Sequence, residues 1–373
     1  MIGGGRGSFI GAVHRMAARL DDRFELVAGV FSSDPERAAA SGADLLLDED
    51  RTYRSLDDLV RMESQRADRI DAAVVVTPNH LHHRISRQLL EARFHVICDK
   101  PLANTVAEAE DLVDIATRRE RVLAVTYNYS GYPLVRQARE MVACGDLGEL
   151  RLVQVEYAQG WLTQPLEATG NKQAAWRIDP DRAGVAGALG DIGSHAFHLA
   201  EFVTGQPVSQ VAADLSTHVP GRRLDDNAQL LLRFEGGARG ALWASQVAVG
   251  IENGLRLRIF GDKAGIEWSQ EAPNHLRVAR LGTPPMLMTR GGPGLGAAAM
   301  QATRIPSGHP EGFIEAFAQI YSDIADLIEA AEGWRKPTGP PHLSSTGQDG
   351  ARGVRFIHAA VESSRRDAAW VSL

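Results

Sequence analysis

The sequence predicts an α/β fold in which a domain with a parallel sheet precedes an α+β domain with a mainly antiparallel sheet. Two observations predict it. In residues 1–130 short apolar runs alternate with helical patterns, as in right-handed βαβ units. In residues 131–373 long β-rich segments follow one another, mostly without helices between them. A chain of 373 residues is also long enough for two domains, and we place the boundary after residue 130.

Each element of the first domain follows from its local pattern. Apolar and β-branched runs predict strands at residues 24–31, 70–77, 94–98 and 122–127. Helical periodicity predicts helices at residues 80–92 and 106–119, and a helix that starts within residues 34–41. For that helix Asp34 is a suitable N-cap and Pro35 a suitable first residue.

The second domain is predicted in the same way. Its first helix covers residues 134–144 and ends at Gly145. Strands are expected at residues 151–157, 208–218, 227–234, 240–249 and 255–260, with a hairpin turn at 235–237. Residues 281–300 are rich in Gly, Pro and Ala and predict an exposed, mobile loop. Helices are expected at residues 311–329 and 353–364, the last packing back near the first domain.

Composition excludes several classes of protein. The chain has 40 Lys and Arg against 47 Asp and Glu, a net charge of −7, which disfavours a binder of nucleic acid or of an anionic membrane surface. Apolar runs such as residues 72–76 are far shorter than the ~20 residues of a membrane span, and no secretory signal pattern opens the chain. Two cysteines, Cys98 and Cys144, make no disulfide framework, so we expect a reducing cytoplasm.

A glycine-rich turn, residues 3–11, opens the sequence ahead of a helical stretch that ends near Leu20. Such a turn lets the backbone approach a pyrophosphate at the helix N-terminus. The strict G-x-G-x-x-G spacing is not met, because Gly3 and Gly5 are followed by Ser8, or by Gly11 if the turn is longer. The cofactor-binding candidates in this turn and the first helical turn are Gly3, Gly5, Ser8, Phe9 and Ile10.

Only Met1 and Ile2 precede this turn, although a strand is expected there. Either that strand is very short, or residues before Met1 are missing from it, and we expect the latter.

The end of the strand predicted at residues 24–31 bears on the choice between NAD and NADP. An acidic residue there bonds the ribose 2′-hydroxyl of NAD, whereas a basic residue accommodates the 2′-phosphate of NADP. Here Ser32 and Ser33 suit either ribose, Asp34 comes slightly late, and Arg37 can reach a phosphate or lie on a solvated helix face. We therefore expect NAD or NADP, with a slight preference for NAD.

Three segments carry the residues suited to chemistry. One loop follows a buried strand and contains Thr77, Pro78, Asn79 and His82, and a second loop follows the next strand and contains Lys100. Both loops therefore lie at the carboxyl edge, where ligands of α/β sheets bind. The third segment contains Trp176-Arg177 and, in residues 187–195, the sequence GALGDIGSH. Asn79 is the stronger cofactor candidate, since His82 and its neighbour in sequence can also be exposed helix positions.

Asp191 and His195 are four residues apart and share one face of a helix. Imidazole suits a general base because its pKa is near neutrality, and a lysine favours a developing alkoxide. The alternatives are a structural histidine, a lysine in an ordinary turn and an ordinary surface pair. His195, His198 and His309 also raise the possibility of a metal, but no third ligand follows at a telling interval, so no metal site is expected.

Taken in order, these motifs resemble the Gfo/Idh/MocA family, the glucose–fructose oxidoreductase and inositol dehydrogenase group. The resemblance covers the glycine turn, TPNxxH, CDKP, WR, the DIGSH segment and the closing helix after Asp349-Gly350. It implies a Rossmann dinucleotide-binding domain and a C-terminal domain with a large open sheet, which commonly forms the oligomer interface, so a homodimer or homotetramer is expected. It also implies that His195 is the acid/base, Lys100 the polarising group and Asp191 a substrate-orienting residue, with Trp176 and Arg177 at the cofactor.

The substrate is expected to be a sugar, glycoside or cyclitol. Residues 158–173 form a long loop with aromatic, amide and charged side chains, among them Trp161, and such a surface suits a polyol. A surface loop anchored by a buried tryptophan is the alternative. Tyr127 and His309 complete the substrate-binding candidates beside Lys100, Asp191 and His195. The family often has an arginine where Tyr129-Ser130 stands here, which puts transfer of a specific substrate in doubt.

Three functions are therefore compared. The first is an NAD(P)-dependent dehydrogenase or reductase that transfers a hydride at a secondary hydroxyl or ketone. The second is an NAD-dependent glycoside-cleaving enzyme of the same fold. The third, a non-catalytic dinucleotide-sensing regulator, is disfavoured because Lys100, Asp191 and His195 are all present.

Overall fold

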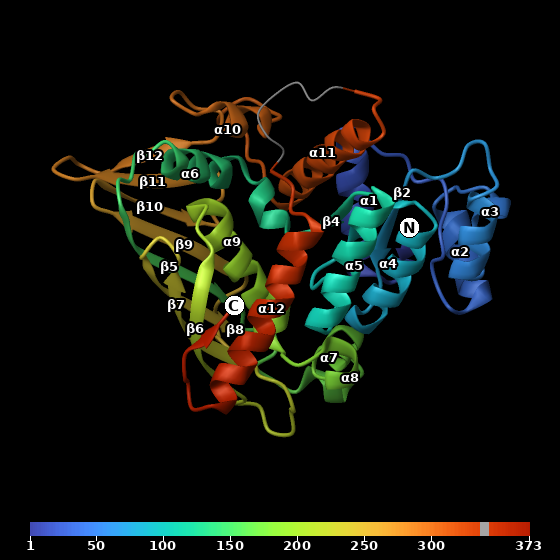
Figure 1. The fold of residues 1–373 in the computed structure, drawn as a ribbon, viewed down its shortest axis with the longest axis horizontal. Coiled ribbons are helices and arrows are strands. Elements are labelled where there is room, and N and C mark those ends of the chain that lie inside the picture. The colour runs from blue at the N-terminus through green and yellow to red at the C-terminus, as the bar shows by residue number, and fades with distance from the viewer. Residues whose placement is uncertain (336–342) are drawn as a thin grey trace. The chain divides into compact units, whose positions relative to one another are not determined.

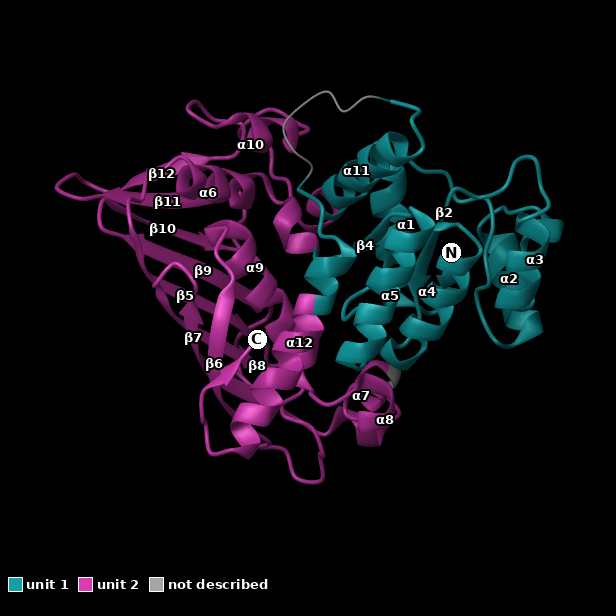
Figure 2. Cartoon of the chain, in the orientation of Figure 1, with its two compact units in different colours: residues 1–127, 317–351 teal, residues 128–316, 352–373 magenta. Residues whose placement is uncertain are grey.

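The computed structural model describes residues 1–335 and 343–373, which form two compact units (Figure 2). The first unit consists of residues 1–127 and 317–351, and the second of residues 128–316 and 352–373. Two of the boundaries fall inside the helices α11 (Phe313–Ala331) and α12 (Gly347–Arg365).

The first unit is built on a parallel sheet of four strands in the order β1-β2-β3-β4, of which β2 and β4 are labelled in Figure 1. The strands are β1 (Ile2–Gly3), β2 (Ala72–Val76), β3 (His95–Cys98) and β4 (Leu123–Val125). Its helices are α1 (Phe9–Leu20), α2 (Pro35–Asp44), α3 (Leu56–Glu63), α4 (His82–Glu91) and α5 (Val106–Arg119), with short 3₁₀ turns at η1 (Glu49–Arg51) and η2 (Asn79–Leu81). The predicted cap of α2 is confirmed, since the Asp34 carboxylate accepts the Arg37 N–H.

The predicted strand at residues 24–31 is wrong as a continuous strand. Only Gly29 and Val30 pair, through isolated parallel bridges to Thr52 and Ile2. The reason is that β1 has two residues, so it offers Val30 a partner at one point only. These bridges nevertheless extend the parallel arrangement beyond β1 on the side away from β2.

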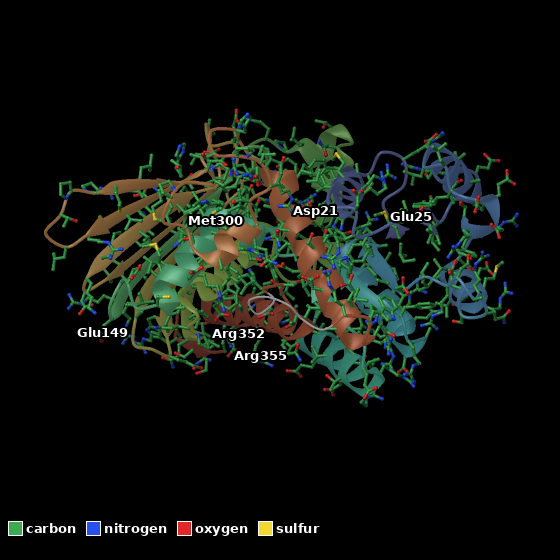
Figure 3. All side chains as sticks on the ribbon, turned by 90° about the horizontal axis from the view of Figure 1, so that it is seen from above. Asp21, Glu25, Glu149, Met300, Arg352 and Arg355 are labelled. Atoms are coloured by element: carbon green, nitrogen blue, oxygen red, sulfur yellow. The ribbon has the colours of Figure 1, made fainter. Side chains whose placement is uncertain are left out.

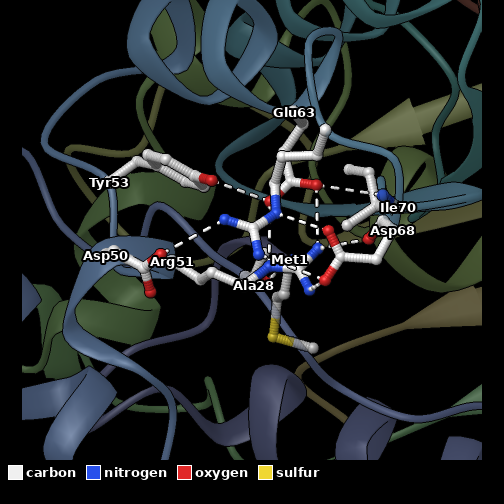
Figure 4. A network of polar contacts seen from close by, with 9 residues as sticks. Met1, Ala28, Asp50, Arg51, Tyr53, Glu63, Asp68 and Ile70 are labelled. Carbon is white, nitrogen blue, oxygen red and sulfur yellow. Dashed lines mark hydrogen bonds and ion pairs between the residues drawn. The ribbon is translucent and has the colours of Figure 1, made fainter.

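A buried ion pair secures this edge of the first unit (Figure 4). The Arg51 guanidinium lies 2.8 Å from the Glu63 carboxylate, and both side chains are almost inaccessible to solvent. Glu63 also accepts the Tyr53 hydroxyl at 2.7 Å and the Ile70 N–H at 3.0 Å. The pair thus joins α3 to the segment that bridges Gly29 and to Ile70, two residues before β2, which stabilises the sheet that carries the glycine turn.

The second unit contains a nine-stranded sheet in the order β12-β11-β10-β9-β5-β8-β7-β6-β13. Its strands are β5 (Leu150–Ala158), β6 (Val208–Ser216), β7 (Asn227–Phe234), β8 (Arg239–Ser245), β9 (Gly254–Gly261), β10 (Ala264–Ser269), β11 (His275–Arg280), β12 (Met286–Thr289) and β13 (Val371–Ser372). All neighbours are antiparallel except β5 and β8, which are parallel. The predicted fold class, with its parallel and mainly antiparallel sheets, is confirmed.

Helices cover one face of this sheet. Helices α6 (Pro133–Ala143), α9 (Ser194–Thr204) and the later part of α12 share a hydrophobic core with the inward side chains of the strands. In that core Phe197 of α9 stacks on Phe356 of α12, with ring centroids 4.0 Å apart. Arg352, labelled in Figure 3, donates from Nε and Nη2 to the Glu201 carboxylate and further joins these two helices. On the other face of the sheet Leu152 and Leu231 are 51% and 56% exposed.

The predicted loop at residues 281–300 is wrong, because it contains β12 and the start of α10 (Ala297–Gln301). The side chains of β12 are mostly exposed at the sheet edge, so the strand is defined by its pairing with β11 and shows no apolar alternation. The remaining short elements are η3 (Asn128–Gly131), η4 (Leu166–Thr169), α7 (Lys172–Arg177), α8 (Pro180–Ala183) and η5 (Leu189–Gly193). Within the described ranges, none of the helices has the length and apolar composition of a membrane span.

Candidate active site

The glycine-rich turn joins β1 to α1 and presents the N-terminus of that helix. Gly3, Gly4 and Gly7 have φ angles of +83°, +75° and +78°, which favour glycine over other residues. A Cβ on Gly11 would lie 2.4 Å from the Cα of Gly4, so the turn and helix approach too closely for a side chain. Ser8 caps α1 by accepting the Gly11 N–H. This cradle fits a pyrophosphate, which would meet backbone N–H groups and the positive end of the helix dipole.

The other predicted cofactor residues of the turn surround this cradle. Gly5 lies against Phe31, at the end of the segment 24–31, since a Cβ there would be 2.7 Å from the Phe31 carbonyl oxygen. Ile10 packs on the buried cluster that contains Phe31, whereas Phe9 is 68% exposed. The turn and the start of α1 therefore pack against the segment that contains Phe31, whereas the Phe9 side chain is accessible to a ligand.

The segment that follows Phe31 contains the ribose candidates. Ser32 Oγ accepts the Asp34 N–H at 3.1 Å, and Asp34 accepts the Arg37 N–H at 2.9 Å. The Arg37 guanidinium donates to the Arg6 carbonyl, which joins this segment to the glycine turn. Ser33 and Arg37 are exposed, so they remain accessible beside the cradle.

The loops after β2 and β3 lie at one edge of the parallel sheet, because these strands are neighbours. Asn79 is 8% exposed in the first loop, beside Thr77 and Pro78. Lys100 is half-buried in the second, and its backbone N–H donates to Asp99 Oδ1 at 2.9 Å. The Thr126 hydroxyl donates to the same oxygen at 2.9 Å. Asp99 thus ties the lysine loop to the residue after β4.

The interpretation of His82 as an exposed helix position is wrong. Its side chain is 1% exposed, and its ring nitrogens lie 2.8 Å from the carbonyl oxygens of Pro101 and Thr77. His83, in contrast, is partly exposed and pairs with Asp111 at 2.8 Å. His82 therefore contacts both loops that carry the predicted cofactor residues.

In the second unit, Asp191 lies in the π-helical turn η5 and His195 in the first turn of α9. Asp191 Oδ2 accepts Arg177 Nε and Gln246 Nε2, each at 2.8 Å. The turn itself is held by Asp225, which accepts the N–H groups of Gly187 and Leu189. Burial raises the pKa of Asp225 to about 6, although these two N–H bonds oppose the rise.

His195 is 8% exposed and packs edge-on against Tyr129, with ring centroids 4.9 Å apart. The Tyr157 ring lies 6.3 Å from it. Tyr129 and Tyr157 share a hydrogen bond of 2.5 Å, and the Tyr157 hydroxyl donates to Asn253 Oδ1 at 2.8 Å. Burial raises the pKa of Tyr129 and Tyr157, and the Asp191 carboxylate raises both further. Asp191 and His195 therefore belong to one cluster around the two tyrosines.

The predicted substrate loop continues this cluster. Trp161 Nε1 donates to Gln159, which in turn donates to Asn253 Oδ1 at 2.7 Å. The Arg177 guanidinium lies over the rings of Trp161 and Trp176, 5.7 and 4.4 Å from their centroids. Indole faces, amides and a carboxylate in one place can bind the ring and hydroxyls of a polyol.

The other two residues that we predicted to bind the substrate, Tyr127 and His309, lie on other segments of the chain. Tyr127 is 1% exposed and follows β4 in the first unit. His309 is exposed on the loop before α11, where Arg290 donates to its carbonyl oxygen. The buried Arg290–Glu311 ion pair, 2.8 Å long, holds this loop.

Sequence reasoning missed Tyr157, Gln246 and Asn253 as site residues. Tyr157 ends β5 and Gln246 follows β8, and these strands are the parallel pair, so their carboxyl ends meet. A sheet expected to be antiparallel gives no reason to bring these two positions together. The only available signal was that Tyr157 and Trp161 flank the start of the substrate loop.

We expect Tyr157→Phe to lower the free energy of unfolding by about 1–3 kcal/mol, because the buried Tyr129 hydroxyl loses its bond to Tyr157 and the Asn253 oxygen keeps its bond from Gln159 but loses the one from Tyr157. Tyr132→Phe is the matched control, since its hydroxyl has only a 3.4 Å bond to Gln270. Urea denaturation of both variants measures the difference. Equal midpoints for the two would contradict the bonded tyrosine pair.

Comparison with known proteins adds independent findings. Residues 1–127 match the family model "Oxidoreductase family, NAD-binding Rossmann fold", and residues 135–267 match "GFO/IDH/MocA C-terminal domain". These matches confirm the predicted Rossmann domain and the NAD cofactor.

Whole-chain relatives agree with the family models. An inositol dehydrogenase homolog from Azotobacter vinelandii is 39% identical, with a TM-score of 0.94 in its NAD⁺ complex over 100% of this chain and 96% of that chain, and it has also been solved with NADH and myo-inositol. An oxidoreductase from Sinorhizobium meliloti is 46% identical, with a TM-score of 0.89 over 99% and 97% of the two chains. The uncharacterised oxidoreductase YfiI of Bacillus subtilis is 33% identical over 100% of this chain and 95% of its own length.

Proposed function

The chain belongs to the GFO/IDH/MocA family of oxidoreductases, and from this premise we propose that it is a dehydrogenase or reductase acting on a secondary hydroxyl or ketone of a sugar, glycoside or cyclitol. The observation that carries the proposal is the cluster of Asp191 and His195 with tyrosine, amide and guanidinium groups beside Trp161. Its polar groups suit several substrate hydroxyls, and its indole suits an apolar ring face. We assign cofactor binding to residues 1–130 and substrate binding to residues 131–373.

Each of three side chains has a distinct role in the proposed reaction. His195 removes the hydroxyl proton as the alcohol is oxidised, and returns it in the reverse direction. The Lys100 ammonium donates to the same oxygen and stabilises the developing negative charge. Asp191, oriented by Arg177 and Gln246, accepts a neighbouring hydroxyl and sets the position of the ring. When bound, NAD supplies the hydride acceptor at C4 of its nicotinamide.

The cofactor is held by residues of the first unit. The glycine cradle with Ser8, Phe9 and Ile10 would receive the pyrophosphate, and Ser32, Ser33 and Arg37 would receive the adenine ribose. Thr77, Pro78 and Asn79 are the further cofactor residues that we propose in the first unit, and Trp176 and Arg177 are those that we propose in the second unit.

A panel of monosaccharides, glycosides and inositols tests the activity. Each compound is incubated with NAD or NADP, and the absorbance of the reduced nicotinamide is followed. We expect reduction of NAD with at least one polyol. Release of an aglycone without net NADH would instead favour the glycoside-cleaving alternative, and binding of NAD with no turnover of any compound would favour the regulator.

The exposed face of the nine-stranded sheet supports a homo-oligomer. A cross-strand row on this face starts with Ala212, Leu231 and Ala241 and continues through Gln154 to Arg258, Glu267 and Arg277. Leu231 is 56% exposed, and the apolar end of the row lines a groove of ≈ 510 Å³.

The binding partner that this face fits is a second copy of the chain. Nine strands of about 4.8 Å spacing give it an area of roughly 1,000 Å², above the ~800 Å² per partner of a standard interface. Its alternating arginine and glutamate allow a twofold-related copy to pair opposite charges. We therefore propose a homodimer or homotetramer formed through this sheet.

We expect Leu231→Glu to shift the protein toward the monomer, because the glutamate would be buried unpaired among apolar residues of the second copy. Leu46→Glu is the matched control, since Leu46 is 92% exposed in the first unit. Sedimentation velocity over a tenfold concentration range measures the masses. A wild-type monomer at every concentration, or an unchanged oligomer in Leu231→Glu, would contradict this interface.

A further inference from the structure

His82 begins α4 with its side chain almost completely buried between two loops. Its Nδ1 lies 2.8 Å from the carbonyl oxygen of Pro101, and its Nε2 lies 2.8 Å from the carbonyl oxygen of Thr77. Thr77 follows β2, and Pro101 follows Lys100 in the loop after β3. One imidazole thus connects the two strand-end loops.

The chemistry of the two acceptors restricts the protonation of the ring. A backbone carbonyl oxygen can only accept a hydrogen bond, whereas a neutral imidazole carries a single N–H. In either neutral tautomer one ring nitrogen would direct its lone pair at a carbonyl oxygen 2.8 Å away. Only the imidazolium donates to both oxygens at once.

The surroundings of His82 favour the same charge state. Burial lowers the pKa of His82, but the Cys98 side chain, the Pro101 carbonyl and the Asp99 carboxylate together raise it to about 9. Cys98 lies in β3 and Asp99 directly after it, and these are the titratable side chains that raise the pKa of the ring. A buried cation with two carbonyl acceptors and a nearby carboxylate is compensated rather than isolated.

We propose that His82 is a positioning residue that acts as an imidazolium, charged at neutral pH, which clamps the loop of Thr77 to the loop of Lys100. The clamp lies one residue after Lys100, and the Asp99 bond to the Lys100 N–H lies directly before the lysine side chain. The backbone that carries the ammonium is therefore held on both sides. The proposed charge of His82 does not depend on the proposed function. The proposed effect of His82 on Lys100 rests on that function.

Nitrogen NMR of the wild-type protein tests the charge directly. At pH 7.5 we expect both ring nitrogens of His82 to resonate as protonated nitrogens with attached hydrogens. A deprotonated signal from either nitrogen at this pH would overturn the proposal. The measurement needs no substrate and no variant, so it stands even if no polyol is oxidised.

Denaturation at several pH values gives a second readout. Because the pKa of folded His82 lies above the unfolded value of 6.5, its stabilising contribution is complete below pH 6.5 and is lost as pH rises through about 9. We expect the urea midpoint of the wild type to fall over this window more steeply than that of His82→Gln. Parallel curves for the two proteins would overturn the proposal.

Activity tests the positioning role. We expect His82→Gln to lower kcat at least about tenfold, because loss of one clamp bond displaces the lysine loop, while NADH affinity stays within about threefold. His83→Gln is the matched control one residue away, on the partly exposed side of α4, and should leave kcat unchanged. An unchanged kcat in His82→Gln would overturn the positioning role and leave the proposed function intact.

Discussion

Replacement of Lys100 by alanine is expected to lower kcat by about 10²–10³-fold, the loss associated with removing one donor to a developing oxyanion. In the proposed reaction the ammonium donates to the substrate oxygen as its proton leaves. The alkoxide then forms without a compensating charge in the variant. The loss should be in kcat, because we assign the pyrophosphate to the glycine cradle and not to this side chain.

Steady-state kinetics with the polyol identified in the panel, combined with NADH titration by fluorescence, measures this separation. Lys263→Ala is the matched control, since Lys263 is exposed in the turn between β9 and β10. It should keep wild-type kinetics. A Lys100→Ala variant with wild-type kcat would remove this lysine from the chemistry.

Replacement of His195 by asparagine should lower kcat by about 10²–10⁴-fold, the usual contribution of a general base. In the wild type, kcat/KM should fall at acidic pH, as the imidazole becomes protonated and can no longer accept the hydroxyl proton. This acidic decline should be absent from the residual activity of the variant, because no histidine base remains to be titrated.

His198→Gln provides the control on the same helix, since His198 is equally buried, lies one turn later and stacks on Phe202. Its kcat and pH profile should match those of the wild type. If His195→Asn kept the acidic decline of the wild type, the base would have to be another group.

The elements with the clearest local patterns were predicted within a few residues. Helix α5 and strand β7 have the predicted bounds, and Asp34 caps α2 as expected. Each of these depends on side chains within the element itself. A capping carboxylate, a helical period or an apolar alternation can be read without knowledge of the neighbours.

The elements that were predicted wrongly depend on their partners. Residues 24–31 are apolar enough for a strand, but the two-residue β1 leaves Val30 a single bridge. Strand β12 shows the opposite error, since its mostly exposed side chains gave no sign of a strand although the segment pairs with β11. Pairing across a sheet is a tertiary property that local composition does not report.

The same distinction applies to the candidate site. Lys100, Asp191 and His195 come from motifs whose order along the chain resembles the family, so they were named from sequence. Tyr157 and Gln246 carry no motif, and only the parallel pairing of β5 with β8 brings them to Asp191 and His195. The burial of His82 likewise depends on the loop of another strand.

The central claim is that Lys100 and His195 act on one substrate hydroxyl. The most direct test is the distance of each nitrogen from that oxygen in a crystal structure of the ternary complex with NADH and the polyol. We expect the Lys100 ammonium and a ring nitrogen of His195 each to lie about 2.6–3.2 Å from the same hydroxyl oxygen. A complex in which the two nitrogens contact different parts of the polyol, or in which either faces away from it, would contradict the claim.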